Sequence, residues 1–431
     1  MAQLLLTSAL CVAALLLSGQ AQALDPQLLV VAHSGTGRTA VVASEIAAMF
    51  DAKLIVYGDW LQPGASQRPK LAQIRGKLNL KGVKRLYFGS PTWTAAPSPE
   101  AQSLLQSLDL HGVEVVPFLT YLHNLAPAAL NHLAQTVTAR GGKPLAPIIL
   151  HAAFSDPPEV LQRATQQAVL ARPDLWPPPT PTPLDCSVRD RLGGVMCRVP
   201  AGPVWLGDDG SAQAPPGSQP PRLQRVAAFA IDRAEVTLAA YQHCQDAGAC
   251  TKVALQDSQC ARLVAAGADR PLPCVAAREA AQYCQSVGKR LPTEAEWTRA
   301  ARAHLATPFV WGKDLPGRAG PPRGNFGEKR ATALPTYGTV ADDADWPTDG
   351  AAGLAVGCSY AAGTSVFGVC DLAGNLAEWV TAPDGPVLKG GSWLDWQASA
   401  LRVASRGRIA LGANVDNFGF YLTGFRCVAA P

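Results

Sequence analysis

The chain has 11 cysteines, yet none of them lies between residues 24 and 185. Their absence excludes disulfides and thiolate metal sites from that stretch. A strong excess of one charge is also missing, because 37 basic residues face 33 acidic ones, for a formal net charge of +4. Composition therefore gives no reason to expect nucleic acid or an anionic membrane surface as a partner.

Long apolar runs are scarce as well. The run over residues 4–17 is shorter than the roughly 20 residues that a membrane-spanning helix needs, and Ala21-Gln22-Ala23 follows it as a small-x-small cleavage pattern. We predict that residues 1–23 are a signal peptide and that the protein is exported, to a periplasmic or extracellular compartment. A buried N-terminal helix or a retained anchor is the alternative. No cysteine follows the cleavage pattern directly, so we expect no lipid anchor and no stable membrane anchor.

The cysteines that remain after the signal form an even set of ten, from Cys186 to Cys427. In an exported chain such a cluster indicates disulfides. Buried thiols or a zinc site are the alternatives, but there is no C-x-x-C pair and little histidine nearby.

A proline-rich stretch, WPPPTPTP over residues 176–183, favours a semi-rigid extended spacer. Cysteine content changes across it. We therefore predict a first domain over residues 24–172, a linker over 173–185 and a second domain over 186–431.

Apolar strands alternate with helical periodicity in the first domain. Such alternation predicts a doubly wound, parallel α/β sheet of five strands, covered by helices on both faces. Strands are expected at 28–32, 54–57, 85–89, 113–119 and 147–150, and helices at 39–50, 99–108, 127–140 and 158–170.

The first predicted strand runs directly into a glycine- and hydroxyl-rich turn, and a predicted helix follows. Backbone N–H groups at a helix start, together with hydroxyls, make an anion site. The pattern S-x-T-G-x-T resembles the flavodoxin family, in which this loop holds the phosphate of FMN. The resemblance implies that the phosphate contacts are Ser34, Thr36, Gly37, Arg38 and Thr39.

The same turn also fits G-x-G-x-x-A with Asp59 about twenty residues on, as in a dinucleotide-binding Rossmann unit. A second loop favours the flavodoxin interpretation, because Gly89-Ser90-Pro91-Thr92-Trp93 resembles that family's G-[ST]-P-x-[WY], whose aromatic residue stacks on the flavin. The resemblance covers residues 27–170 and places a third flavin-contacting loop at Thr120 and Tyr121. The implied fold is the flavodoxin-like doubly wound sheet.

An empty site on the same fold stays open as an alternative. The third loop, residues 121–125, lacks the glycines that many flavodoxins have there. His33 and His123 are candidate catalytic residues, although loop histidines are more often solvated bystanders.

The second domain carries ordered motifs that resemble the formylglycine-generating enzyme (sulfatase-modifying factor) family. They are E-V-T at 235–237, G-x-R-L-P-T-E-A-E-W at 288–297, W-G at 311–312, G-N-x-x-E-W at 374–379, K-G-G-S-W at 389–393 and G-F-R-C at 424–427. The resemblance implies a compact α+β domain related to C-type lectins. It also implies a disulfide between Cys284 and Cys427, because the family joins its A-Y-C helix to its G-F-R-C tail.

Local chemistry agrees with the motif order. Thr293 stands where a helix N-cap belongs, with Glu296 three residues on as in a capping box. Gly288 is placed to end the preceding helix.

Two positions depart from the family's pattern. Active members bind copper through two cysteines shortly after their R-G-G-S motif, where this chain has Asp395 and Ala400. Soft thiolates suit Cu(I), and a carboxylate and a methyl group do not replace them. Lys389 stands for the motif arginine and lacks its planar fork. We therefore do not expect a copper-dependent formylglycine-generating enzyme.

The family also carries structural calcium. Asn375 and Glu378 match one such site, with a hydrogen-bonded turn without metal as the alternative. A second site would use Asn325, the carbonyl of Phe326 and one acid from Asp342, Asp343 and Asp345.

Two functions remain open at this point. In the first, FMN takes up electrons and the second domain positions an unknown protein or small-molecule partner. In the second, the protein is an exported, non-enzymatic binding protein with an empty flavodoxin fold. The sequence names neither the substrate nor the electron donor.

Overall fold

The computed structural model divides the chain into two compact units, Met1–Pro173 and Asp174–Pro431. Each unit has its own hydrophobic core. The predicted signal peptide and the proline-rich stretch lie outside the described residues. The structure describes residues 25–34, 37–58, 70–75, 78–92, 96–122, 127–153, 156–170, 172–175, 185–190, 194–208, 221–253, 258–314, 321–327, 349–351, 353–395, 397–407 and 421–431.

The first unit is built on one parallel sheet. Its strands run in the order β2-β1-β3-β4-β5, with β6 also paired to β4, and every pairing is parallel. Because β5 pairs with the start of β4 and β6 with its end, the two short strands share the fifth position. This is the flavodoxin-like strand order, so the predicted fold is confirmed. The strands are β1 (Asp25–His33), β2 (Ala52–Tyr57), β3 (Arg85–Thr92), β4 (Glu114–Tyr121), β5 (Lys143–Pro144) and β6 (Ile148–His151).

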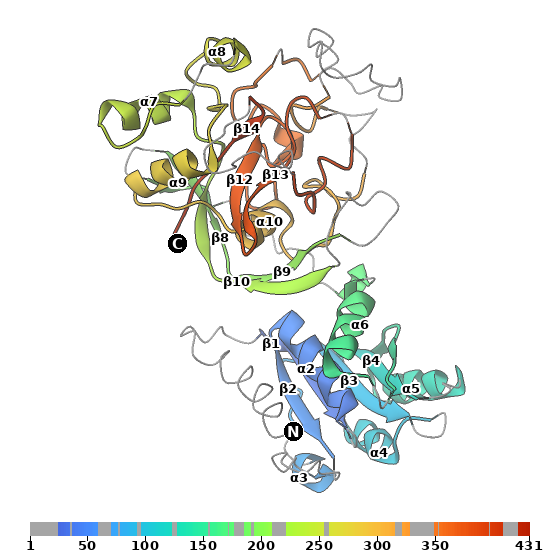
Figure 1. The fold of residues 1–431 in the computed structure, drawn as a ribbon. Helices are drawn as coiled ribbons and strands as arrows, with labels where there is room; N and C mark the ends of the chain where they lie inside the picture. The colour runs from blue at the N-terminus through green and yellow to red at the C-terminus, as the bar shows by residue number, and fades with distance from the viewer. Residues whose placement is uncertain are drawn as a thin grey trace, which may run out of the picture. The chain divides into compact units, whose positions relative to one another are not determined.

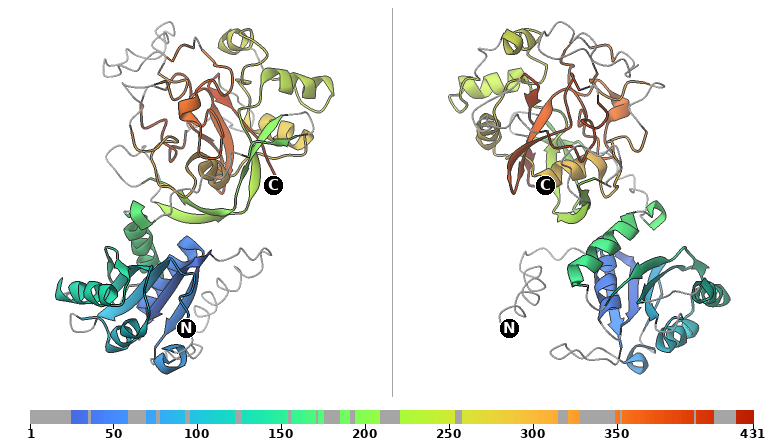
Figure 2. Two further views of the ribbon diagram at one scale, coloured as in Figure 1. Left: turned by 180° about the vertical axis from the view of Figure 1, so that it is seen from behind. Right: turned by 45° about the vertical axis from the view of Figure 1, so that its right-hand side comes forward.

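Helices cover both faces of this sheet. The helix α2 packs against α6, whereas α4 packs against α3 and α5 (Figures 1 and 2). The buried apolar strands need this cover, since a parallel sheet exposes neither face to water. The short helix α3 was not expected from the sequence. The helices are α2 (Arg38–Phe50), α3 (Leu71–Arg75), α4 (Pro99–Ser107), α5 (Pro127–Ala139) and α6 (Pro158–Leu170), and a 3-10 turn, η1, spans Pro173–Leu175.

The second unit has small, separate sheets and long irregular segments. Its sheets have the strand orders β15-β11-β8-β7, β10-β9 and β13-β12-β14. Trp205, Trp297 and Trp379 are among the largest buried side chains of this unit, and Trp297 and Trp379 belong to its two main hydrophobic clusters. The strands are β7 (Val188–Arg189), β8 (Val195–Val199), β9 (Gly202–Leu206), β10 (Arg222–Val226), β11 (Phe229–Asp232), β12 (Ala377–Ala382), β13 (Gly385–Lys389), β14 (Thr423–Gly424) and β15 (Val428–Ala429).

The helix boundaries of this unit follow the predicted capping chemistry. Thr293 Oγ1 accepts a hydrogen bond from the Glu296 N–H at 3.2 Å, and Glu296 Oε2 accepts one from the Thr293 N–H at 2.9 Å. Gly288 adopts φ 75° just beyond the preceding helix, a conformation that favours glycine. The helices are α7 (Leu238–Asp246), α8 (Ser258–Val264), α9 (Ala277–Ser286), α10 (Glu294–Arg302) and the 3-10 turn η3 (Ala361–Gly363).

All ten cysteines from Cys186 to Cys427 are paired in five disulfides, as predicted. The family-implied pair Cys284–Cys427 is among them and ties α9 to the C-terminal tail. The other pairs are Cys186–Cys197, Cys244–Cys250, Cys260–Cys274 and Cys358–Cys370.

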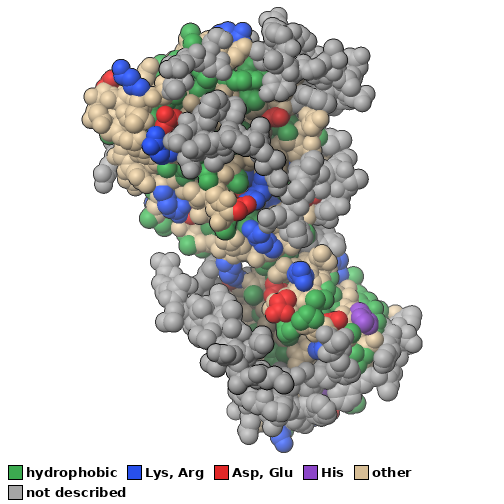
Figure 3. All heavy atoms as spheres, in the orientation of Figure 1, with side chains coloured by type: hydrophobic (Ala, Val, Ile, Leu, Met, Phe, Trp, Pro, Cys, Tyr) green, Lys and Arg blue, Asp and Glu red, His purple; other side chains and the backbone are tan. Residues whose placement is uncertain are grey.

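None of the helices in the described residues is long and apolar enough to span a bilayer. On the face drawn in Figure 3, basic and acidic side chains lie interspersed over the described surface, in keeping with the charge balance of the sequence.

The disulfides differ in the length of chain that they close, and this predicts unequal contributions to stability. Cys284 and Cys427 are 143 residues apart, but Cys244 and Cys250 are only 6 apart. Loop-closure entropy gives about 5 kcal/mol for the long loop and about 2 kcal/mol for the short one. We therefore expect the double serine variant at 284 and 427 to lower the unfolding free energy of the second unit more than the matched variant at 244 and 250. Denaturant unfolding measures both, and equal losses would contradict the expectation.

Candidate functional site

The carboxyl ends of the strands of the first unit meet at one edge of the sheet. The register pairs His33 with Tyr57, Thr92 with Tyr121, and Tyr121 with His151, so β1, β2, β3, β4 and β6 all end at this edge. The chain leaves β1 toward β2 on one side, while β3 lies on the other. Such a switch point is where open α/β sheets bind ligands.

The predicted phosphate loop occupies this switch point. Gly37 caps α2 with φ 92°, and Arg38 begins the helix. Ser34 is buried, and its Oγ accepts a hydrogen bond from the Ala40 N–H at 3.1 Å. Thr36 lies outside the described residues. The described part of the loop therefore brings a serine hydroxyl and a helix start together, and its role in phosphate binding stays a prediction.

Thr39 and Thr120, which the sequence assigned to different loops, are in direct contact. Their Oγ1 atoms are 2.7 Å apart and buried. Thr92 Oγ1 donates to the Thr120 carbonyl at 3.3 Å, which extends the chain from α2 through β4 to β3. Arg38 Nη1 donates to the Asp156 carbonyl, in the segment after β6, at 3.3 Å. These contacts hold the helix start against the end of β4 and the segment after β6, and they join β4 to β3.

The second predicted loop begins where β3 ends. Pro91 and Thr92 are the last residues of β3, but Trp93, the predicted stacking residue, lies outside the described residues, as does His123. Tyr121 is half-buried and meets the ring of His151 edge-on, with the centroids 5.4 Å apart. The β4 and β6 side of this sheet edge therefore carries an aromatic pair.

The residues at this edge fit the phosphate end of FMN. The first N–H groups of an α-helix have no partner within the helix, and its positive dipole end favours an anion. The ends of β1 and β2 are in contact here. The Ser34 N–H donates to the Tyr57 carbonyl at 2.9 Å, and a Cβ at Gly58 would lie only 2.5 Å from the Ser34 carbonyl oxygen. This contact fixes the start of the phosphate loop.

In the second unit, the loop after β13 is closed by Asp395. Its Oδ2 accepts hydrogen bonds from the Ser392 N–H at 2.7 Å and the Ser392 hydroxyl at 2.8 Å. Burial raises the pKa of the Asp395 carboxyl above its usual range. Ala400 N donates to the Gln397 carbonyl within a turn. With all ten cysteines of the described residues paired, no thiolate pair stands at this loop. The residues present do not fit copper.

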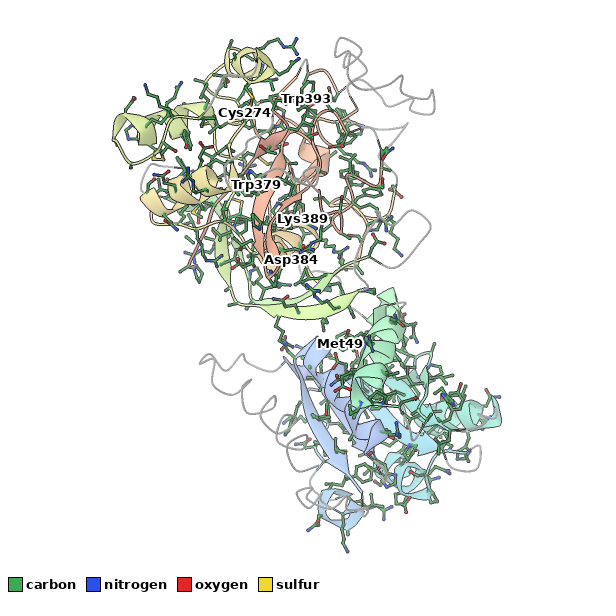
Figure 4. All side chains as sticks on the ribbon, in the orientation of Figure 1. Met49, Cys274, Trp379, Asp384, Lys389 and Trp393 are labelled. Atoms are coloured by element: carbon green, nitrogen blue, oxygen red, sulfur yellow. A yellow bond between two sulfur atoms is a disulfide. The ribbon has the colours of Figure 1, made fainter. Side chains whose placement is uncertain are left out.

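Lys389 is a buried cation at the start of the same loop (Figure 4). Its Nζ lies 3.6 Å from Glu294 Oε1 and 5.6 Å from the centre of the Trp297 ring. Burial lowers the pKa of Lys389 to about 7, although Glu294 opposes the shift. Arg406 also binds Glu294, so the Glu294 carboxylate lies between Lys389 and Arg406. Arg406 in addition binds Asp384, which lies in the turn between β12 and β13.

The predicted calcium ligand Glu378 is instead half of a buried ion pair. Arg426 Nη2 donates to Glu378 Oε1 at 2.6 Å, and Arg426 Nε donates to Oε2 at 2.7 Å. Trp297 Nε1 donates to Oε2 at 2.8 Å. The carboxylate thus faces a guanidinium and an indole rather than an open cation site.

Asn375 is equally engaged in hydrogen bonds, and calcium at Asn375 and Glu378 stays a prediction. Its Oδ1 accepts hydrogen bonds from Asn325 Nδ2 at 2.9 Å and the Ala355 N–H at 3.0 Å. Its Nδ2 donates to Glu235 Oε2 at 3.1 Å. Within the described residues, no group of three or more His, Cys, Asp or Glu side chains is placed to hold a metal ion.

The second calcium prediction is only partly covered by the described residues. Asn325 Oδ1 is buried and has no hydrogen-bond partner there. The Phe326 N–H donates to Asp349 Oδ2 at 3.1 Å, an acid that sequence reasoning did not select. Asp342, Asp343 and Asp345 lie outside the described residues. A calcium ion at Asn325 and the Phe326 carbonyl stays a prediction.

Sequence reasoning missed that Glu235, the acid of the E-V-T motif, belongs to the buried cluster of Glu378 and Arg426 and accepts a hydrogen bond from Asn375. Burial raises its pKa well above the usual range, and the carboxylates of Asp371 and Glu378 raise it further. The opposite charges of the motif residues Glu235, Glu378 and Arg426 were the signal that could have revealed this cluster.

Fold and site together define a flavodoxin-like domain joined to an α+β domain with a K-G-G-S loop. A family model described as the sulfatase-modifying factor enzyme 1-like domain matches residues 187–431, more than half of the chain. The chain belongs to this family.

Curated relatives include both active and inactive members. The inactive C-alpha-formylglycine-generating enzyme 2 of Mus musculus is 30% identical over 168 residues, which cover 37% of this chain and 49% of the relative. The formylglycine-generating enzyme of Thermomonospora curvata is 31% identical over 189 residues, which cover 38% and 56%. The chain thus spans about half the length of the curated relatives that it matches.

Solved structures resemble each domain at low identity. CarF is 17% identical with a TM-score of 0.35 and covers 55% of this chain and 98% of its own. A flavoprotein in complex with FMN from Lactobacillus acidophilus is 19% identical with a TM-score of 0.22 and covers 28% and 92%. The flavodoxin-like assignment rests on the strand order of the sheet and not on these likenesses.

The buried Glu378–Arg426 pair predicts a large loss when one partner is removed. Glu378→Gln leaves the Arg426 guanidinium buried without a counter-charge, which is expected to cost about 3–5 kcal/mol of unfolding free energy. Asp384→Asn is the matched control, because Asp384 pairs with Arg406 at 58% side-chain exposure, where about 0–1 kcal/mol is expected. Denaturant unfolding of the second unit measures both, and a small loss in Glu378→Gln would contradict the role assigned to the pair.

Proposed function

We propose that the protein is an exported flavin-dependent redox protein that binds FMN at the carboxyl edge of the first sheet. The observation that carries the proposal is the meeting of Ser34, the start of α2 and the ends of β3 and β4 at a topological switch point. Bound FMN would supply one- and two-electron transfer. Export is supported by the five disulfides of the second unit.

The proposed contacts divide between the two ends of the cofactor. The phosphate would lie on Ser34, Thr36, Gly37, Arg38 and Thr39, where amide groups and the helix dipole favour an anion. The flavin ring would lie against Pro91, Thr92 and Trp93 on one side and Thr120 and Tyr121 on the other.

The second domain would position a protein or small-molecule partner rather than oxidise cysteine. This proposal is supported by Asp395 and Ala400 at the copper-ligand positions and by the disulfide pairing of every described cysteine. A carboxylate that already binds Ser392 does not offer the soft sulfur that Cu(I) requires.

One observation favours a second candidate, an exported binding protein with an empty flavodoxin fold. Ser34 Oγ already accepts the Ala40 N–H, and the Thr39 hydroxyl is engaged with Thr120. Two hydroxyls of the site therefore take part in internal hydrogen bonds without a ligand. Flavin absorbance of the purified protein distinguishes the two candidates.

FMN binding is tested at the cap of α2. Gly37→Asp places a carboxylate where the phosphate would lie, and we expect FMN affinity to fall at least about tenfold, or 1.4 kcal/mol. Gly37→Asn is the matched control, because asparagine meets the same φ of 92° without charge. Titration with FMN, followed by flavin fluorescence, measures the affinities. Equal binding by the wild type and Gly37→Asp would overturn this site.

The absence of formylglycine generation is tested with a sulfatase-type peptide, copper and a reductant. We expect no aldehyde product by mass spectrometry. The double variant Asp395→Cys with Ala400→Cys is expected to gain Cu(I) binding, and Asp395→Ser with Ala400→Ser is its control without sulfur. Copper-dependent turnover by the wild-type protein would refute the proposal.

A further inference from the structure

His33 is a buried histidine at the end of β1, one residue before the phosphate loop begins. Only 4% of its surface is exposed. Its Nδ1 lies 2.7 Å from the hydroxyl of Ser98, the N-cap of α4, whose Oγ accepts the Ala101 N–H at 3.3 Å. The histidine therefore joins the end of β1 to the helix that follows β3.

Ser98 continues this connection to the loop after β3. The Ser98 N–H donates to Ser90 Oγ at 3.0 Å, and the two hydroxyl oxygens are 3.3 Å apart. The Ser90 hydroxyl donates to the Pro91 carbonyl at 2.9 Å. A continuous hydrogen-bonded chain thus runs from His33 to Pro91, one of the proposed flavin contacts.

The other side of the imidazole is held by β2. The Tyr57 ring packs against it with the centroids 5.2 Å apart and the planes tilted by 44°. The Tyr57 carbonyl accepts the Ser34 N–H, so the residue that flanks His33 also holds the start of the phosphate loop. His33 consequently contacts groups that fix both ligand loops.

We propose that His33 is a positioning residue that holds the phosphate loop and the loop after β3 in register, and that its protonation strengthens the hold on a phosphorylated flavin. The proposal rests on the FMN site proposed above. It concerns a residue outside the flavodoxin motifs that define that site.

The hydrogen-bond chain has two consistent arrangements, and the proton on Nδ1 selects between them. When Nδ1 has no proton, the Ser98 hydroxyl donates to it. When Nδ1 carries a proton, it donates to Ser98 Oγ, and the Ser98 hydroxyl turns to Ser90 Oγ. The link to Ser98 survives in both, so protonation adds charge without breaking the connection.

The sign of the effect follows from the charges around the ring. Tyr57 from β2 packs against the ring, and Glu100, from the first turn of α4, lies close enough to raise the pKa of Tyr57. The N-terminal dipole of α4 opposes a positive imidazole, and a phosphate beside Ser34 favours it. An unperturbed histidine changes charge between about pH 5 and 8, and burial disfavours the charged form. Phosphate binding and His33 protonation should therefore assist each other, by reciprocity.

Two variants of the full chain separate position from charge. Asparagine can reproduce the Nδ1 contact but does not titrate, whereas phenylalanine loses the contact. At pH 8, His33→Phe is expected to weaken FMN binding about 3- to 10-fold, the equivalent of one hydrogen bond, and His33→Asn is expected to remain close to wild type. Between pH 8 and pH 6, the ratio of wild-type to His33→Asn affinity should rise about fivefold for FMN.

Two controls test whether the pH response requires the phosphate of the ligand and the imidazole of His33. FMN has its own phosphate ionisation near pH 6, which all variants share and the ratio removes. Riboflavin lacks the phosphate and should show no rise. His111→Asn changes an imidazole with 82% side-chain exposure in the same unit and should keep the wild-type response.

The outcomes distinguish this inference from the FMN proposal. A ratio that does not change with pH, or His33→Phe binding FMN as tightly as wild type, overturns the role of His33 and leaves the FMN site standing. If wild type binds no FMN at either pH, the proposed function fails, and inorganic phosphate replaces FMN in the test. A shift of the His33 ring resonances toward the protonated form on adding phosphate would then support the His33 proposal, and no shift would overturn it.

Discussion

The hydrogen bonds of the buried Arg426 guanidinium connect the segments on which the fold of the second domain depends. Its Nε and Nη2 bind Glu378, its Nη1 reaches the carbonyls of Asp232 and Arg233, and its Nη2 also reaches that of Cys370. A side chain from the C-terminal tail therefore joins the end of β11, the segment before the G-N-x-x-E-W motif, and β12. A lysine could not replace it, because only the planar fork of arginine presents donors in several directions at once.

The same network holds the neighbouring polar side chains. Glu378 binds Arg426, and Asn375 binds Asn325 and Glu235. Burial favours the neutral form of Glu235, which limits the negative charge around the single guanidinium. In this domain, the motif residues form a buried polar network in which each charge has a defined partner.

Much of the first domain could be predicted from the sequence, because its signals are local. Continuous apolar runs and amphipathic helical patterns predicted the sheet and its covering helices. A turn rich in hydroxyl residues and glycine predicted the loop at Ser34 and Gly37. The contact between Thr39 and Thr120 could not be predicted, since it joins residues 81 positions apart. The short helix α3 could not be predicted either, because five residues are too few to show the apolar spacing of a helix.

The second domain was recognised from its motifs, but motif spacing did not reveal the hydrogen-bond partners of Asn375 and Glu378. Amide and carboxylate oxygens suit calcium, which is why the motif predicted a metal site there. Glu378 pairs with Arg426 and Asn375 with Asn325, 48 and 50 residues away in the chain. A local pattern cannot show which distant side chain has already taken an oxygen.

The hydrogen bonds of the first domain also indicate which interactions would provide ligand affinity. Thr39 and Thr120 contact each other, and Ser34 Oγ accepts the Ala40 N–H, so internal hydrogen bonds orient these hydroxyls at the proposed phosphate site. The amide groups and dipole at the start of α2, and stacking of the flavin between the loops, would add to these contacts. Affinity then depends on how accurately the two loops are spaced. That spacing depends on the buried contacts from His33 to Ser98 and from Thr39 to Thr120, so we expect a residue outside the proposed ligand contacts, such as His33, to influence binding at the proposed site.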